Sequence, residues 1–133
     1  MIKIQYENEL DALVLEIDDE LSFVLYKRVI ETVFAHPRFR PGINVLYDLR
    51  NAPGVSLTTD DVRLVGEYGR AIKDRRGPAW KAAIVVTGLA EYGLGRMFEI
   101  LNSEAPFKTK VFMDAGEARM WLKQDDGGIP KGG

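Results

Sequence analysis

Alternation of apolar and polar residues predicts that the chain opens with a β-hairpin. Residues 2–7 alternate in the manner of a half-buried strand, and residues 12–17 form a second, more apolar stretch. Asn8 and Glu9 stand between the two stretches and supply turn-forming residues. The first two strands are therefore expected to pair with each other directly.

Downstream of the hairpin, apolar strand segments alternate with segments of helical spacing. The first helix is expected to follow Asp18, Asp19 and Glu20, whose acidic side chains favour the positive end of a helix dipole. It should end at His36, because a residue that precedes proline is pushed out of the α region. Further strands are expected at 43–49, 80–87 and 110–113, and further helices at about 58–76, 89–102 and 114–124.

The resulting order, ββαβαβαβα, predicts a single α/β domain over residues 1–124. Helices separate the last four strands, so crossover connections are required and the sheet should be mixed. We expect a mixed five-stranded sheet with four helices packed on it. Residues 125–133 contain four glycines and are expected to form a flexible tail.

Two helices carry more apolar residues than one buried face requires. A surface helix needs an apolar face of about 100°. The first helix has one stripe at Leu21, Leu25, Val29 and Val33, and a second set at Phe23, Tyr26, Ile30 and Phe34. The third helix is expected to turn Leu89, Gly93, Met97 and Leu101 inward, which leaves Leu94 and Phe98 off that stripe. The additional residues are candidates for core packing, for a ligand pocket, or for a homodimer or partner interface.

Composition and charge exclude several classes of site. The 133 residues carry a net charge of −2, so no overall field favours nucleic acid or an anionic membrane. Cysteine is absent and histidine occurs once, which excludes thiolate zinc sites, disulfides and multi-histidine metal sites within one chain. The N-terminal residues lack the pattern of a secretory signal, and no apolar run could span a bilayer. We therefore expect a cytoplasmic protein without cofactor, metal or membrane span.

Two segments resemble the SpoIIAA-like family of the STAS superfamily. Residues 45–50 read Val-Leu-Tyr-Asp-Leu-Arg, which is similar to the family's apolar strand that closes on Asp-Leu-Arg. Residues 111–122 resemble its last strand and its Glu-Ala-x-x-Trp-Leu helix. The resemblance spans about 12–122 and implies a STAS-like domain that binds or regulates rather than catalyses, as does a comparison with the lipid-binding Sec14 group.

The regulatory phosphorylation motif of STAS antagonists has only a partial counterpart here. Thr58 falls near the acceptor position implied by the resemblance, but the preceding Asp and the following Gly-Leu are missing. Thr58 or Thr59 is thus a candidate phosphoacceptor, and the alternative is a helix cap, since a threonine hydroxyl accepts from first-turn amides. Capping explains the same residues without a kinase.

Other candidate residues have structural interpretations beside the functional ones. Asp48 ends an inner strand, and Arg50 lies close by in the sequence. Open α/β sheets bind ligands at this position, so Asp48 is a candidate ligand site, and the alternative is that it anchors the following loop.

His36 could act as a base but is expected to cap helix carbonyls. Residues 92–96 lack the third glycine of a dinucleotide motif, so close helix packing is favoured. Residues 73–76 form a basic helix end without stacking aromatics, which does not favour nucleic-acid binding.

The sequence therefore favours a non-enzymatic STAS-like regulatory or protein-interaction domain, expected to form a homodimer and to contact a regulatory partner. The alternative is a carrier or sensor of a small, lipid-like apolar ligand in a pocket between the first and third helices and the sheet. No catalytic residue is assigned, because no nucleophile or acid–base motif is present.

Overall fold

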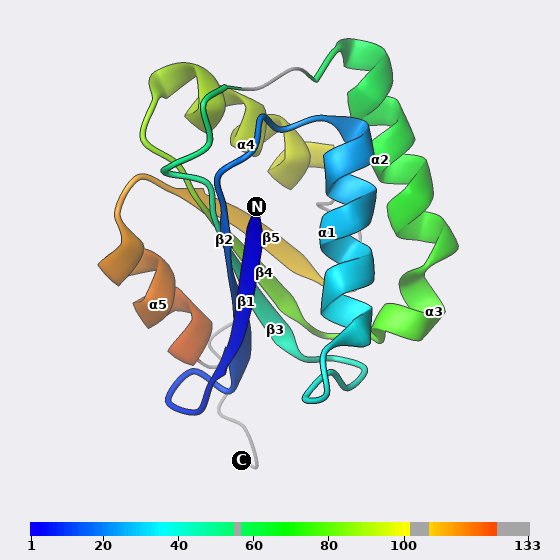
Figure 1. Cartoon of the computed structure of the whole chain (residues 1–133), viewed down its shortest axis with the longest axis vertical. Helices are drawn as coiled ribbons and strands as arrows, with labels where there is room; N and C mark the ends of the chain where they lie inside the picture. Colours follow the sequence, from blue (N-terminus) through cyan, green and yellow to red (C-terminus); the bar gives the residue numbers. More distant parts are fainter. Residues whose placement is uncertain (55–56, 102–106, 125–133) are drawn as a thin grey trace.

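The computed structural model describes residues 1–54, 57–101 and 107–124, and in these ranges it contains five strands and five helices (Figure 1). The strands are β1 (Ile2–Glu7), β2 (Ala12–Ile17), β3 (Asn44–Asp48), β4 (Lys81–Val85) and β5 (Lys108–Phe112). The helices are α1 (Phe23–Ala35), α2 (Thr59–Ala71), α3 (Lys73–Arg76), α4 (Leu89–Leu101) and α5 (Ala115–Lys123).

The five strands form one sheet in the spatial order β1-β2-β3-β4-β5. The hairpin strands β1 and β2 pair antiparallel, and the other three pairs are parallel. Parallel neighbours require crossover connections, which are right-handed in nearly all proteins, so successive crossovers of this order lie on one face of the sheet. Accordingly α1, α2 and α3 lie on one side of the sheet and α5 lies on the other (Figure 1). The predicted mixed five-stranded α/β fold is confirmed.

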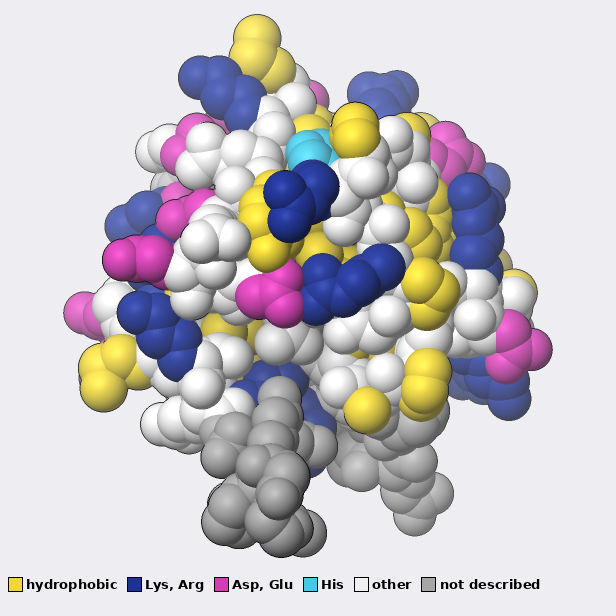
Figure 2. Space-filling model, turned by 90° about the horizontal axis from the view of Figure 1, so that it is seen from below, with side chains coloured by type: hydrophobic (Ala, Val, Ile, Leu, Met, Phe, Trp, Pro, Cys, Tyr) yellow, Lys and Arg dark blue, Asp and Glu magenta, His cyan; other side chains and the backbone are white. Residues whose placement is uncertain are grey.

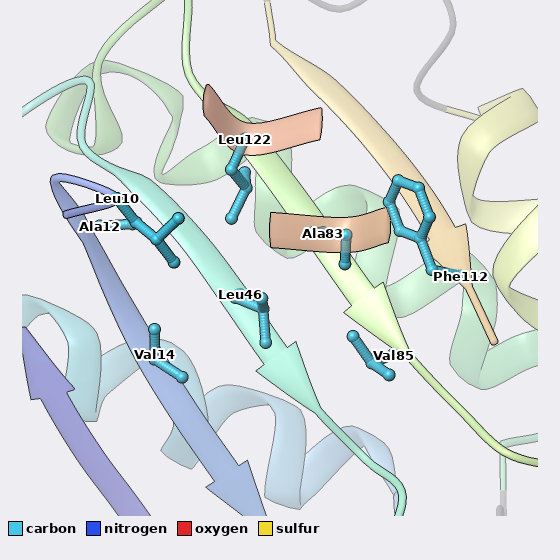
Figure 3. Packing of buried hydrophobic residues seen from close by; sticks show 9 residues of the cluster. Leu10, Ala12, Val14, Leu46, Ala83, Val85, Phe112 and Leu122 are labelled. Atoms are coloured by element: carbon cyan, nitrogen blue, oxygen red, sulfur yellow. The ribbon is translucent and has the colours of Figure 1, made fainter. Parts of the chain in front are cut away.

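Both faces of the sheet are covered, because alternate residues of the inner strands point to opposite sides. On the α1 side, Leu13 and Leu15 of β2 pack with Val29 and Val33 of α1. On the α5 side, a second cluster joins strand residues to Ala118 and Leu122 of α5. Its strand and turn members, shown with Leu122 in Figure 3, are Leu10, Ala12, Val14, Leu46, Ala83, Val85 and Phe112.

The start of α1 differs from the prediction. Ser22 is the N-cap, and its hydroxyl accepts a hydrogen bond from Leu25 N at 3.1 Å. No acidic residue lies in the first turn. Asp18 and Asp19 instead lie before the helix and contact the amino group of Met1 at 2.6 and 2.5 Å. The expected dipole interaction was wrong because a hydroxyl cap placed the helix start beyond the acidic residues.

The second predicted helix is interrupted. Helix α2 ends at Ala71, and after Ile72 the chain continues as the one-turn helix α3.

Within the described ranges, no helix has the length and apolar character needed to cross a membrane. The predicted tail, 125–133, lies outside the described residues.

Candidate functional site

A cavity of about 380 Å³ lies on the face of the sheet that α1 and α2 cover. Its volume falls within the range of about 300–1,000 Å³ that is usual for small-molecule sites. Most of its lining is apolar and comes from α1, α2, α4 and the strands β3 and β4. Lining residues include Tyr26, Ile30, Tyr47, Val65, Ile84 and Phe98.

Arg76, the last residue of α3, lines this cavity and is only 1% exposed. Its guanidinium carbon lies 3.8 Å from the ring centre of Trp80. The Trp80 ring in turn stacks on Phe107, with ring centres 4.3 Å apart and planes inclined by 9°. These three side chains therefore form one contiguous group in the cavity wall.

The backbone after α3 explains why Arg76 is held inside. Gly77 has a φ of +91°, a conformation that favours glycine, and a Cβ there would lie 2.5 Å from Gly42 N. The Arg76 carbonyl accepts a hydrogen bond from the same Gly42 N at 2.8 Å. The close approach of these two turns holds the end of α3, and with it the buried Arg76 side chain, in the cavity wall.

The guanidinium group of Arg76 lacks a charge partner within the described residues. Its Nε, Nη1 and Nη2 atoms are buried and donate no hydrogen bond there, and no described Asp or Glu lines the cavity. Burial lowers the pKa of Arg76, and the nearby Tyr47 and Tyr26 oppose this shift. Burial raises the pKa of both tyrosines, so their hydroxyls stay protonated at neutral pH.

The magnitudes indicate that the two aromatic rings near this cation, Trp80 at 3.8 Å and Phe39 at 6.0 Å, do not compensate it fully. A desolvated cation–π contact contributes about 2 kcal/mol. Removing one ion from water costs several kcal/mol even after relaxation. Arginine also keeps its proton in proteins. The cavity therefore contains a permanent positive charge that favours a negatively charged group.

The second buried cation, Lys81 of β4, shows the contrasting arrangement. Lys81 is 6% exposed, and its Nζ donates to the carbonyl oxygens of Trp121 at 2.9 Å and Gln124 at 2.6 Å. These carbonyls lie at the C-terminal end of α5, where a cation is favourable. Lys81 is therefore a structural residue, and Arg76 differs from it in having no acceptor among the residues that the structure describes.

The predicted pocket or interface residues divide between two environments. Tyr26, Ile30 and Phe98 line the cavity. Phe23 packs edge to face on Tyr68 of α2 at 6.5 Å, as Tyr26 does at 6.0 Å. Phe34 packs on Phe39 at 5.1 Å and has Arg75 over its ring at 4.0 Å. Leu94 belongs to α4, but its side chain lies outside the described part of the structure.

The two candidate phosphoacceptors lie at the exposed start of α2. The Thr58 hydroxyl accepts from Asp61 N at 3.1 Å, and the Asp61 carboxylate accepts from Thr58 N at 3.1 Å. This reciprocal pair is a capping box, and Thr59 is the first helical residue. Phosphorylation of Thr58 or Thr59 stays a prediction.

Asp48 and Arg50 contact each other just after β3. One Asp48 oxygen accepts from Arg50 N at 3.0 Å and Nε at 2.9 Å, and the other accepts from Nη2 at 2.7 Å. The Arg50 guanidinium holds the pKa of Asp48 below its usual range. Asp48 thus binds both the backbone and the side chain of Arg50, as a residue that anchors the following loop would. Neither Asp48 nor Arg50 lines the cavity.

His36 lies at the opposite end of α1 from the acidic segment. Its Nδ1 accepts from Arg38 N at 3.0 Å, so the ring orders the following turn and does not cap helix carbonyls as predicted. Figure 2 shows this histidine at the surface, with basic and acidic side chains nearby.

The glycines of α4 have different roles. A Cβ on Gly95 would lie 2.5 Å from Val111 Cγ2, so Gly95 allows the helix to approach β5 closely. Gly93 is exposed and meets nothing. The predicted inner stripe was wrong, because Leu89 and Met97 are 79% and 45% exposed.

Across the described residues, no cluster of His, Cys, Asp and Glu suited to a metal ion is present.

Arg76, Trp80 and Phe107 were not singled out by the sequence. Arg76 belongs to a basic run whose pattern predicts a helix end, and Trp80 stands at the start of a predicted strand. Gly77-Pro78 directly after the basic run indicates where the helix ends, but it carries no signal for the burial of Arg76.

Comparison with known proteins identifies the fold. No protein-family model matches the chain, and no curated protein does so. Among solved structures, an uncharacterized protein of the DUF3478 family from Shewanella loihica PV-4, described as having a SpoIIAA-like fold, matches with a TM-score of 0.56. The two sequences are 20% identical, and the match covers 92% of each chain. The chain therefore has a SpoIIAA-like α/β fold.

Proposed function

We propose that this domain is a non-enzymatic binding module that holds a small apolar ligand in the cavity between its helices and the sheet. The observation that carries the proposal is the cavity itself, which is about 380 Å³ in volume and lined mostly by aliphatic and aromatic side chains. Its position between α1, α4 and the sheet is the one expected for the carrier or sensor considered from the sequence. Binding there would stabilise the folded domain, because a ligand that binds only the folded state shifts the folding equilibrium toward it.

Titration with the uncharged dye N-phenylnaphthylamine, whose fluorescence rises in apolar surroundings, tests the proposal. Ile84→Phe adds volume to the cavity floor from β4 and should weaken dye binding about tenfold or more, since one methylene in an apolar pocket changes affinity by about 10–200-fold. Native mass spectrometry of protein purified from its host should also reveal a bound mass of lipid size.

Met97→Phe provides a matched control, because Met97 is exposed on α4 and does not line the cavity. This variant should bind the dye as the parent protein does. Equal dye affinity in the parent and in a folded Ile84→Phe variant would reject the cavity as the binding site. Circular dichroism and thermal unfolding establish that both variants fold.

A second function, a regulatory protein-interaction domain, is favoured by one surface feature. Leu89, Met97 and Ile100 lie on one side of α4 and are 79%, 45% and 68% exposed. Such a stripe suits a homodimer or a regulatory partner. By contrast, Phe23 and Phe34 contact aromatic residues of their own chain. Light scattering of the parent protein and of Ile100→Glu tests this second function, with loss of a dimer mass expected in the variant.

A further inference from the structure

We propose that the ligand is an amphiphile with a single carboxylate group, and that Arg76 binds this carboxylate inside the cavity. This inference rests on the proposed function and specifies the ligand class. Arg76 recognises the charged end of the ligand, and the apolar wall of the cavity recognises its tail.

The first argument is the state of the Arg76 side chain. It is 1% exposed and lines the cavity, yet its three guanidinium nitrogens have no acceptor within the described residues. A guanidinium presents planar paired donors that match a carboxylate in a bidentate manner. Because the surrounding side chains cover these nitrogens, a carboxylate reaches them when a neighbouring lining side chain rotates.

The second argument is the charge of the cavity wall. The described lining residues include Arg70, Lys73 and Arg76 but no acidic residue. Arg70 and Lys73 are exposed, so water screens their charges, whereas the charge of Arg76 is shielded from water. One buried unit charge matches a monoanion. The protonated hydroxyls of Tyr26 and Tyr47, which also line the cavity, are additional donors for the oxygens of the ligand's carboxylate.

The third argument is the apolar remainder of the cavity. Ile30, Val65, Ile84 and Phe98 line it from three helices and the sheet, and they offer no hydrogen-bonding side chain. A free small anion would leave this surface without a partner. An alkyl or aromatic tail buries it, so an amphiphile fits the cavity better than an isolated carboxylate.

Fluorescence of Trp80 provides a direct readout of binding, because Trp80 lines the cavity and contacts Arg76. Trp121→Phe leaves Trp80 as the single tryptophan, since the chain has two. In this background we would titrate decanoate, decanol and acetate at neutral pH. Decanoate should bind about 10–100-fold more tightly than decanol, as expected for a charge-assisted hydrogen bond, and acetate should not bind.

The decisive variants are Arg76→Met, Arg76→Lys and Lys73→Met. Arg76→Met retains an apolar side chain of similar length and should bind decanol as before, but lose the preference for decanoate. Arg76→Lys keeps the charge without the bidentate geometry and should retain only part of the preference. Lys73→Met removes an exposed cation of the same wall and should change the preference by less than about fivefold.

The outcomes separate the two proposals. Equal binding of decanoate and decanol by the parent protein, or a preference for decanoate that survives in Arg76→Met, would overturn the carboxylate inference and leave the apolar site standing. Binding of acetate as tight as that of decanoate would overturn the amphiphile. Absence of binding by both ten-carbon ligands, together with absence of dye binding, would overturn the proposed function itself.

Discussion

The guanidinium carbon of Arg76 lies 3.8 Å from the ring centre of Trp80, and both side chains line one apolar cavity. The ring offers its negative face to the cation, but none of the three guanidinium nitrogens donates a hydrogen bond within the described residues. The contact therefore orients the charge without neutralising it. A cation held in this way lowers the stability of the fold until an acceptor reaches it.

Arg76→Met is expected to raise the free energy of unfolding of the ligand-free protein by about 1–4 kcal/mol, because well-packed apolar residues often outperform buried ions. Urea unfolding followed by far-UV circular dichroism measures the change. Arg75→Met is the control, since Arg75 is exposed and should change stability by less than about 0.5 kcal/mol. A strongly destabilised Arg76→Met variant would show that the charge has a structural partner.

Lys81→Met is expected to have the opposite effect and to lower the free energy of unfolding by about 2–3 kcal/mol. The substitution removes two hydrogen bonds from a buried cation to the end of α5. Lys123→Met alters an exposed lysine of the same helix end and serves as the control in the same urea experiment. Unchanged stability of Lys81→Met would contradict the assigned capping role.

Gly95→Ala and Gly93→Ala should change stability in opposite directions. The first places a methyl group 2.5 Å from Val111 Cγ2 and should cost about 1–3 kcal/mol through overpacking. The second meets no atom within 4 Å and should stabilise α4 by about 0.5–1 kcal/mol, as alanine is the better helix former. Thermal unfolding of the two variants compares them directly, and equal melting temperatures would reject the close contact with β5.

Thr58→Ala should lower the free energy of unfolding by about 1 kcal/mol, because the Asp61 amide loses its acceptor. Thr58→Asp retains a capping oxygen and should remain close to the parent protein. Thr59→Ala, one residue into α2, should have a smaller effect. If Thr58→Ala and Thr59→Ala were equally stable, the capping box would contribute nothing measurable.

Asp48→Asn should make the protein less sensitive to acid. Arg50 lowers the folded-state pKa of Asp48, so the ion pair contributes stability above the unfolded-state pKa of about 3.9 and loses it as the pH falls through the folded-state value. The stability difference between parent and variant should be constant above about pH 5 and shrink below about pH 4. Urea unfolding across this range measures it, and a difference independent of pH would exclude the ionic contribution.

Local patterns were sufficient for the strands and the fold class. The predicted strands at 2–7 and 12–17 coincide with β1 and β2, because strand alternation and turn residues act over a few neighbours. The element order then restricted the sheet to a mixed one through the crossover rule. The break at Ile72 was not predicted, since it depends on where α3 meets the turn around Gly42.

The orientation of α4 could not be obtained from its residues. Apolarity favoured an inner face with Leu89 and Met97, but the structure places Gly95 against Val111. Packing of a helix close to a sheet selects the smallest side chain at the point of contact rather than the most apolar stripe. That choice depends on a strand that follows in the sequence and adjoins α4 only in the folded chain.

The sequence by itself determined an α/β fold with a mixed five-stranded sheet, and it identified the additional apolar residues of α1 and α4. Only the tertiary structure decided that some of them line a cavity and that Arg76 is buried in its wall while Arg75 is exposed. Adjacent helical residues point about 100° apart, so burial depends on how the helix is rotated against its neighbours. Contacts between distant turns set that rotation, and no local pattern records them.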